Sequence, residues 1–330
     1  MKIVFLDGKA NVADGVCKDR LFELGEAYFY EATEHTPKAE IERIGDADII
    51  ISAKCIINRE VIESCPNLKL ISQIGTGYNT IDVQAATEHG IAVSYVPSYA
   101  TDAVAQHAIA LLLEICNKVG HHDAAVHAGR WIESDFFCFW DYPLVELSGK
   151  NMGVIGYGHI GKAVAKVAHA LGMNILTLNR HPGETDEIAA FVDMDTLLAE
   201  SDVVALQIPL TAETQGFINR ETIAKMKDGA ILLNNSRGAL VVEQDLADAL
   251  NSGKLAAAGL DVLCAEPMSA DNPLYTAKNC VITPHISWVA KETRQRLVDI
   301  ALENVYNFIQ GTPTNIVNPE YDRAAAIRCR

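Results

Sequence analysis

Three short segments in the second half of the chain carry an arginine, a glutamate and a histidine, each soon after a predicted strand. Arg237 follows the strand that ends at Asn234, Glu266 lies in a loop before a proline, and His285 follows a Thr-Pro pair. The planar guanidinium of arginine binds a carboxylate through two hydrogen bonds. Histidine titrates near neutral pH, and a paired carboxylate orients its ring and favours the protonated form. The set suits reduction of a 2-keto acid, with Arg237 on the carboxylate and His285 donating the proton.

Each of the three residues also has an ordinary structural explanation. An arginine after a strand is commonly a surface charge, a glutamate before proline a loop residue, and a histidine after proline part of a turn. Their order downstream of a nucleotide-binding motif favours the catalytic interpretation. We expect no metal in this chemistry, because Arg237 and a protonated His285 supply the polarisation that a cation would otherwise give. The eight cysteines include no CxxC pair and no Cys/His cluster at metal spacing.

A glycine-rich loop predicts a dinucleotide site. An apolar strand (151–155) precedes it and a helix rich in alanine and valine (162–171) follows it. In such a loop the first glycine permits the turn, the second lets the backbone approach a pyrophosphate, and the third allows close helix–strand packing. The N–H groups at the helix N-terminus would bind the anion. The predicted cofactor contacts here are Gly156, Tyr157, Gly158, His159, Ile160 and Gly161. A plain strand–turn–helix is the alternative.

The end of the next strand (175–179) indicates which nicotinamide cofactor binds. An acidic residue at this point would accept a hydrogen bond from the ribose 2′-OH of NAD(H) and repel a 2′-phosphate. This chain has Asn179, with Arg180 and His181 after it. Arginine suits a phosphorylated ribose, so NADP(H) is slightly favoured over NAD(H). Alternatively, Arg180 is a solvated surface charge and either cofactor binds.

Apolar runs alternate with amphipathic stretches along most of the chain. Strands are predicted at 2–6, 27–30, 48–52, 69–74, 91–94, 151–156, 175–179, 203–208, 230–234, 257–260 and 280–282. Helices are predicted at 37–44, 59–64, 80–89, 101–120 and 291–310. This rhythm is typical of parallel sheets covered on both faces. We therefore expect an α/β protein with two Rossmann-like, doubly wound parallel-sheet domains. An aromatic-rich stretch, 131–142, indicates a buried contact or an interface loop.

The composition limits the partners. The formal net charge is −16, which opposes binding to nucleic acid or to an anionic membrane. No apolar run approaches the length of a membrane span, and the N-terminus has the pattern of a strand and not of a secretion signal. We expect a cytoplasmic protein with reduced thiols.

Taken together, the motifs resemble those of the D-isomer-specific 2-hydroxyacid dehydrogenase family. The resemblance covers nearly the whole chain and includes the segment 73–82, the glycine-rich loop and the three catalytic segments. It implies a discontinuous, flavodoxin-like substrate domain (1–98 and 288–330) and an NAD(P)-binding Rossmann domain (99–287). It also implies an active site in the cleft between them and a homodimer formed through the nucleotide-binding domains.

The resemblance also implies roles for single residues. Arg237 would bind the substrate carboxylate and carbonyl, His285 would be the acid/base, and Glu266 would pair with it. Further substrate contacts would come from Gly75, Thr76, Gly77 and Trp288. Further cofactor contacts would come from Thr101, Val104, Pro209, Asn235, Ser236 and Asp261.

Within the family, two segments resemble those of glycerate dehydrogenases, which are also called hydroxypyruvate reductases. These are 137–143 and 285–288; a formate dehydrogenase would have glutamine in place of Glu266. The expected substrate pair is hydroxypyruvate/D-glycerate, then glyoxylate/glycolate, then a bulkier 2-keto acid. The alternative from another class is a cofactor-sensing binding protein of the corepressor type with little turnover. The lack of a long polar tail and of an extended linker counts against it.

Overall fold

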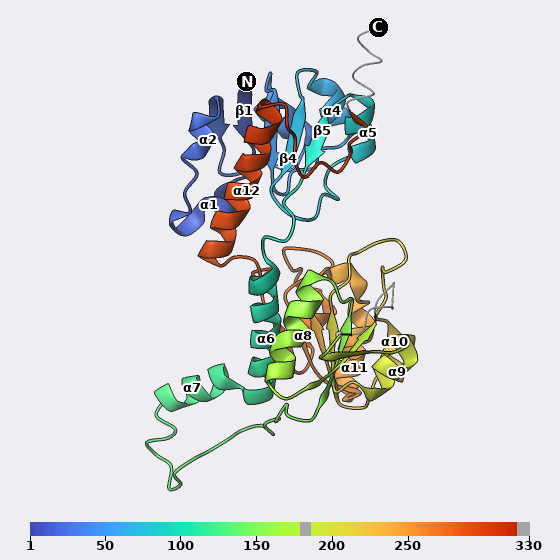
Figure 1. Ribbon diagram of the computed structural model, residues 1–330. Helices are drawn as coiled ribbons and strands as arrows, with labels where there is room; N and C mark the ends of the chain where they lie inside the picture. The colour runs from blue at the N-terminus through green and yellow to red at the C-terminus, as the bar shows by residue number, and fades with distance from the viewer. Residues whose placement is uncertain (179–185, 322–330) are drawn as a thin grey trace. The chain divides into compact units, whose positions relative to one another are not determined.

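The computed structural model describes residues 1–178 and 186–321, which form two compact units (Figure 1). The first unit comprises residues 1–100 together with the segment that begins at Val289, and the second unit comprises residues 101–288. Each unit contains one parallel β-sheet with helices packed on it. The predicted α/β class with two parallel sheets is confirmed.

The first unit has a five-stranded sheet in the order β2-β1-β3-β4-β5. Its strands are β1 (Lys2–Phe5), β2 (Glu26–Phe29), β3 (Ile49–Ser52), β4 (Leu70–Gln73) and β5 (Ala92–Ser94). Its helices are α1 (Lys9–Val12), η1 (Ala13–Gly15), α2 (Arg20–Glu23), α3 (Pro37–Ile44), α4 (Arg59–Ser64), α5 (Val83–Glu88) and α12 (Lys291–Ile309). β3 and β4 are buried along their whole length, as expected for central parallel strands covered on both faces. The side chains of Thr36, Asn58 and Asp82 cap α3, α4 and α5 by accepting backbone N–H groups.

Helix α12 packs on the first unit, although the whole second unit separates it from β5 in sequence (Figure 1). Its Arg294 is buried and donates to the backbone carbonyls of Ala13, at 2.8 Å, and Ala10. The same guanidinium forms an ion pair with Asp14 at 2.7 Å. These contacts anchor the helix to α1 and η1.

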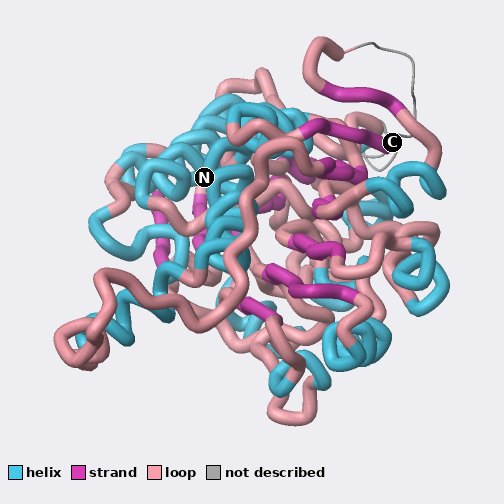
Figure 2. The backbone as a smooth tube through the Cα atoms, turned by 90° about the horizontal axis from the view of Figure 1, so that it is seen from below, coloured by secondary structure: helices cyan, strands magenta, loops and turns pink. Residues whose placement is uncertain are grey.

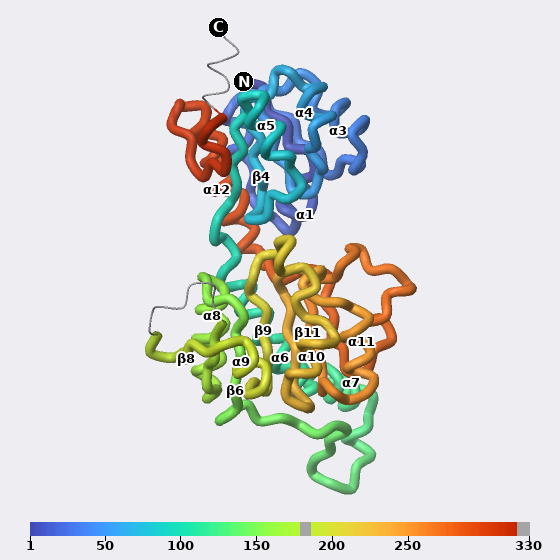
Figure 3. The backbone as a smooth tube through the Cα atoms, turned by 90° about the vertical axis from the view of Figure 1, so that its right-hand side faces the viewer, coloured from blue at the N-terminus to red at the C-terminus, as the bar shows by residue number. Residues whose placement is uncertain are grey.

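The second unit has a seven-stranded sheet in the order β12-β11-β10-β9-β6-β7-β8. Its strands are β6 (Asn151–Ile155), β7 (Asn174–Leu178), β8 (Ala189–Phe191), β9 (Val203–Leu206), β10 (Ala230–Asn234), β11 (Leu255–Leu260) and β12 (Cys280–Ile282). Its helices are α6 (Thr101–Asn117), α7 (Val119–His127), α8 (His159–Ala170), α9 (Met194–Glu200), α10 (Arg220–Lys225), η2 (Gly238–Leu240), α11 (Glu243–Ser252) and η3 (Pro273–Thr276). One apolar core includes α6 and α8, which lie side by side, and the other includes α9, α10 and α11 (Figure 3).

Several elements differ from the prediction. The helices α1, α2, α9, α10 and α11 were not predicted, and α8 begins at His159 and not at residue 162. The helix predicted at 101–120 ends at Asn117, where Lys118 adopts a left-handed backbone conformation and α7 begins. The short strand β8 was not predicted. A loop follows α7 and extends to the start of β6, as the colouring by secondary structure shows (Figure 2). Within residues 1–178 and 186–321, no helix is both long and apolar enough to cross a membrane.

Candidate active site

The three predicted catalytic segments follow three neighbouring strands of the second unit. β10, β11 and β12 are adjacent and parallel, so their carboxyl ends meet at one edge of the sheet. Arg237, Glu266 and His285 follow β10, β11 and β12 in that order. Open α/β sheets bind ligands at this edge.

His285 and Glu266 form a hydrogen-bonded pair. The distance from His285 Nδ1 to Glu266 Oε2 is 2.6 Å. The other carboxylate oxygen accepts the backbone N–H of Leu263 at 3.1 Å, which fixes the carboxylate plane. The two side chains remain partly exposed, at 30% and 35%. Because Nδ1 is engaged, Nε2 is the ring atom available for proton transfer.

Asp261 holds the loop that carries His285. Its carboxylate is buried and accepts the backbone N–H groups of Ile286 and Ser287, both at 2.8 Å, and the hydroxyl of Thr283 at 2.6 Å. Burial alone would raise the pKa of Asp261, but hydrogen bonds from His107, Ser287 and Thr283 lower it to about 2. The carboxylate is thus an ionised anchor for the loop. A contact of its own with the cofactor remains a prediction.

His107 connects this network to α6. Its Nε2 lies 2.9 Å from the Thr283 hydroxyl and 3.4 Å from the Asp261 carboxylate. Sequence reasoning did not identify His107. Its position in the middle of an alanine- and leucine-rich helix was the only available signal.

Arg237 is exposed beside this pair of loops. Its Nη1 donates to the backbone carbonyl of Ser236 at 2.7 Å, and its own carbonyl accepts the Asn234 side chain at 2.8 Å. The next residue, Gly238, packs directly on the backbone of Leu263, where a Cβ atom would overlap that backbone. This contact brings the arginine loop against the segment that leads to Glu266.

The glycine-rich loop has the geometry that a dinucleotide pyrophosphate requires. Gly156 has φ +99°, and a Cβ there would collide with Gln207. Gly158 caps α8 and has open space where a side chain would be. A Cβ on Gly161 would strike the carbonyl of Gly156, so helix and strand can pack closely only with glycine. The three positions fit the three roles predicted for them.

The intervening residues of the loop differ in exposure. Tyr157 is buried, and its ring packs edge-on against Phe191 at 5.8 Å between centroids. Burial raises its pKa to about 12. His159 is exposed at the start of α8 and Ile160 is half-buried. Tyr157 therefore contributes its side chain to the core.

Asn235 and Ser236 make internal hydrogen bonds. The Asn235 amide donates to the carbonyl of Val104 at 2.9 Å and accepts from Gln207 at 2.8 Å. The Ser236 hydroxyl donates to the carbonyl of Leu206 at 2.7 Å. These bonds tie the start of α6 to the ends of β9 and β10, and sequence reasoning missed Gln207.

The remaining predicted contacts lie at several places. Thr101 begins α6, and Pro209 is exposed beyond the end of β9. Trp288 is the last residue of the second unit and is half-buried. Asn179, Arg180 and His181 lie outside the described residues.

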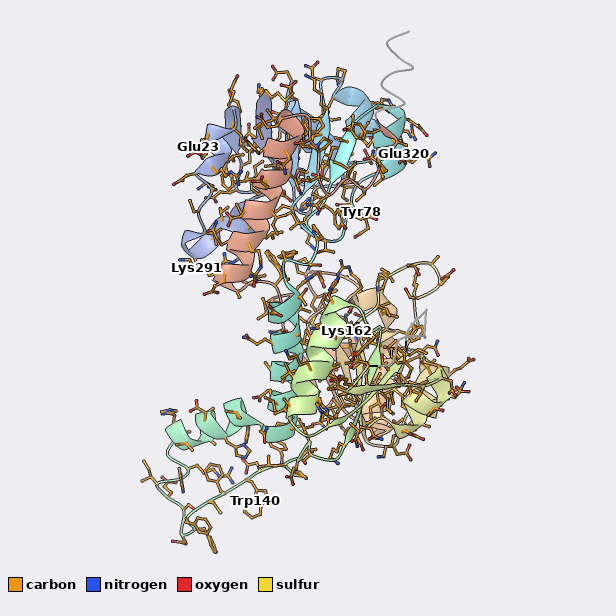
Figure 4. The ribbon with its side chains drawn as sticks, in the orientation of Figure 1. Glu23, Tyr78, Trp140, Lys162, Lys291 and Glu320 are labelled. Carbon is orange, nitrogen blue, oxygen red and sulfur yellow. The ribbon has the colours of Figure 1, made fainter. Side chains whose placement is uncertain are left out.

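In the first unit, Gly75, Thr76 and Gly77 form the loop after β4. The Thr76 hydroxyl donates to the carbonyl of Val96, and the Gly75 carbonyl accepts the N–H of Val96, both at 2.9 Å. The loop is therefore fastened to the segment after β5. Tyr78, next along the chain, is exposed (Figure 4).

Comparison with known proteins identifies the family. Residues 109–287 match the model of the D-isomer specific 2-hydroxyacid dehydrogenase, NAD binding domain. The chain is 55% identical over 321 residues to a hydroxypyruvate reductase from Blautia hydrogenotrophica, covering 96% of this chain and 100% of that relative. It is 37% identical to a glycerate dehydrogenase from Methylorubrum extorquens, covering 96% and 98%. Among solved structures, an acyclic imino acid reductase in complex with NADPH and D-Arg aligns with a TM-score of 0.85 at 30% identity. The alignment covers 96% of this chain and 100% of that one.

The chain therefore belongs to the D-isomer-specific 2-hydroxyacid dehydrogenase family, as its motifs predicted. It is an oxidoreductase that acts on CH–OH groups and transfers a hydride between a nicotinamide cofactor and a 2-keto acid. These relatives do not favour the alternative, a cofactor-sensing binding protein.

Proposed function

We propose that the chain reduces hydroxypyruvate to D-glycerate, with glyoxylate as a second substrate. The proposal rests on the hydrogen bond of 2.6 Å between His285 Nδ1 and Glu266 Oε2, which lies at the same sheet edge as Arg237. The relative that is 55% identical over its full length is a hydroxypyruvate reductase, which favours this substrate within the family. Two further relatives, from Thermococcus litoralis and Korarchaeum cryptofilum, are glyoxylate reductases.

The proposed chemistry needs an anion-binding group, an acid and an orienting base. Arg237 binds the substrate carboxylate through its guanidinium and thereby orients the adjacent carbonyl. His285 donates the proton on Nε2 to the carbonyl oxygen, and the Glu266 carboxylate stabilises the protonated ring. When bound, a nicotinamide cofactor would supply the hydride that this reduction needs. The roles of Gly75, Thr76, Gly77 and Trp288 in binding substrate remain predictions.

The residues of the second unit fit a dinucleotide cofactor. Gly158 leaves the loop open at the N-terminus of α8, where a pyrophosphate accepts backbone N–H groups. Lys162, one turn into α8, adds a positive charge near this end of the helix (Figure 4). We propose NADPH as the preferred form, because Asn179 stands where an acidic residue would select NAD and Arg180 follows it.

One steady-state comparison tests substrate and cofactor together. We expect kcat/KM to fall in the order hydroxypyruvate, glyoxylate, phenylpyruvate, and to be higher with NADPH than with NADH. Arg180→Ala should weaken the binding of NADPH by about 10-fold or more and should change the binding of NADH little, as expected for a lost 2′-phosphate contact. Arg220→Ala, at an exposed arginine of α10, is the matched control and should change the affinity for neither cofactor. No turnover of any 2-keto acid would contradict the reaction, and equal losses for both cofactors would contradict the NADPH preference.

We also propose a homodimer formed through the second unit. The segment from Val119 to Ser148, called here the arm, comprises α7 and the loop after it and projects from that unit (Figure 1). Its loop exposes large apolar side chains, of which Ile132, Phe136, Phe137 and Trp140 are 66–89% exposed. Figure 4 shows Trp140 on this loop. Such a patch is typical of a surface that is covered in an oligomer.

The arm has a defined shape. Asp141 accepts from His121 at 2.6 Å and pairs with Arg130, whose guanidinium also lies over the ring of Phe139 at 4.4 Å. These contacts hold the loop to α7, so the loop presents its apolar side chains on a preformed structure.

The cytoplasmic location stays a prediction, supported by seven free thiols among the described cysteines.

A further inference from the structure

The first unit brings together three potential metal ligands that are distant in sequence. His35 precedes α3, Glu40 lies in the first turn of that helix, and Cys55 lies three residues after β3. A ring nitrogen of His35, a carboxylate oxygen of Glu40 and the Cys55 sulfur all lie within 4.8 Å of one another. Glu40 and Cys55 are fully buried, whereas His35 is exposed and connects the cluster to solvent.

The Glu40 carboxylate has one oxygen that lacks a partner. Oε1 accepts the backbone N–H of Ile56 at 2.7 Å, whereas Oε2 is buried without any hydrogen-bond partner. Buried polar atoms are nearly always satisfied, because leaving one unpaired costs free energy. One oxygen oriented by a backbone N–H and the other available is the arrangement of a carboxylate that ligates a metal.

The cluster also lies where sheets of this type bind ligands. In the strand order β2-β1-β3-β4-β5, the chain moves to one side of β1 and then to the other, which places the switch point between β1 and β3. Asp7 follows β1 and accepts the backbone N–H groups of Ala53, Lys54 and Cys55 after β3. Asp7 therefore fixes the segment that carries Cys55 and adds a negative charge beside it.

We propose that His35, Glu40 and Cys55 bind a divalent ion of the zinc type. Nitrogen, carboxylate oxygen and thiolate sulfur are the ligands that Zn²⁺ takes in proteins, at about 2.0–2.3 Å. Ligand atoms bound tetrahedrally at those lengths lie roughly 3–4 Å apart, so small side-chain rotations from the present positions suffice. One thiolate and one carboxylate balance the charge of the ion, and the fourth position is left to water on the side of His35.

The proposed metal site is independent of the catalytic pair, because its three ligands belong to the first unit and none takes part in the hydride transfer. Its ligands are 5 and 15 residues apart in sequence, outside the usual zinc-binding spacings. Only the parallel sheet brings them together.

A cobalt titration of the chelator-treated, full-length protein tests the proposal. We expect one Co²⁺ per chain with a thiolate-to-cobalt charge-transfer absorption, and a thermal unfolding midpoint that rises with added Zn²⁺. Cys55→Ser should abolish the charge-transfer absorption. His35→Ala, at an exposed position that should not affect folding, should weaken Co²⁺ binding at least about 10-fold.

Two matched variants control for the chemistry of the residue types. Cys65→Ser changes another buried thiol of the same unit, and His89→Ala changes another histidine there. Both should bind Co²⁺ like the unaltered protein. Absence of the charge-transfer absorption in the unaltered protein would overturn the proposal. So would a His35→Ala variant that binds Co²⁺ with unchanged affinity.

Discussion

At the scale of single residues, His285 is held in place from both its side chain and its backbone. Its ring is paired with Glu266, and its N–H donates to the carbonyl of Asp261 at 2.9 Å. Its backbone has φ +55°, which is rare for a residue with a side chain and costs of the order of 1–3 kcal/mol. The bonds from the two following N–H groups to the Asp261 carboxylate offset that cost.

Asp261→Asn should reduce stability in a way that depends on pH. The folded-state pKa, about 2, lies below the ordinary value of 3.8, so the unfolded chain binds more protons between them. The ionised carboxylate therefore adds about 2 kcal/mol to the free energy of unfolding above about pH 4, and this contribution is lost as the pH falls toward 2. Urea unfolding should be measured from neutral pH down to about pH 3. The free energy of unfolding of Asp261→Asn should be well below that of the unaltered protein at neutral pH, and this difference should become smaller in acid.

Glu200→Gln, at an exposed carboxylate at the end of α9, is the control and should leave the pH dependence unchanged. If the free energies of unfolding of Asp261→Asn and the unaltered protein differed by the same amount across the whole pH range, Asp261 would not act through its charge.

Residue types and order predicted that Arg237, Glu266 and His285 each follow a strand and that Glu266 pairs with His285, and the structure has them there. Their catalytic roles stay a prediction. The same reasoning could not find His107 or Gln207, whose importance comes from contacts across the fold. It also treated Asp261 only as a cofactor contact, although its carboxylate anchors the loop of His285. Inward or outward orientation of a polar side chain at a strand end depends on packing that no local pattern encodes.

At the scale of elements, each predicted strand begins and ends within two residues of the strand in the structure. Buried parallel strands are continuous apolar runs, and such runs are visible in sequence. β8 was missed because its Ala-Ala-Phe sequence contains no β-branched residue, whereas β5 and β12, which are also three-residue edge strands, contain valine or isoleucine. The division between α6 and α7 was missed because neither glycine nor proline marks it; Lys118 adopts the left-handed conformation instead.

Gly238→Ala should destabilise the protein through loop packing alone. The added Cβ would overlap the backbone of Leu263, and relief of such overpacking typically costs about 1–3 kcal/mol. The thermal unfolding midpoint should fall, and kcat should fall as well, because the contact positions Arg237 relative to Glu266. Gly120→Ala, where a Cβ meets only ordinary contacts in α7, is the control. A midpoint unchanged from that of the unaltered protein would show that the loops can separate freely.

At the scale of the whole molecule, the arm predicts self-association. We expect a dimer in sedimentation equilibrium, because the apolar side chains of the arm favour burial against a second copy. The double substitution Phe136→Ser and Phe137→Ser should shift the equilibrium toward monomer by at least about 10-fold, equivalent to roughly 1.4 kcal/mol.

Tyr275→Ser removes an equally exposed aromatic side chain elsewhere on the second unit and serves as the control. It should remain a dimer. A monomeric unaltered protein, or a double variant that dimerises normally, would remove the arm from the interface.

In the proposed reaction the His285–Glu266 pair is the proton donor for reduction of a 2-keto acid. The most direct measurement is kcat for hydroxypyruvate with saturating cofactor, compared between the unaltered protein, His285→Ala and His169→Ala. His169 lies near the end of α8 and is exposed, so its substitution controls for loss of a histidine. We expect kcat to decrease by about 10²–10⁴-fold for His285→Ala, the usual contribution of a general acid, and not to change for His169→Ala. A His285→Ala variant that retains kcat would contradict it.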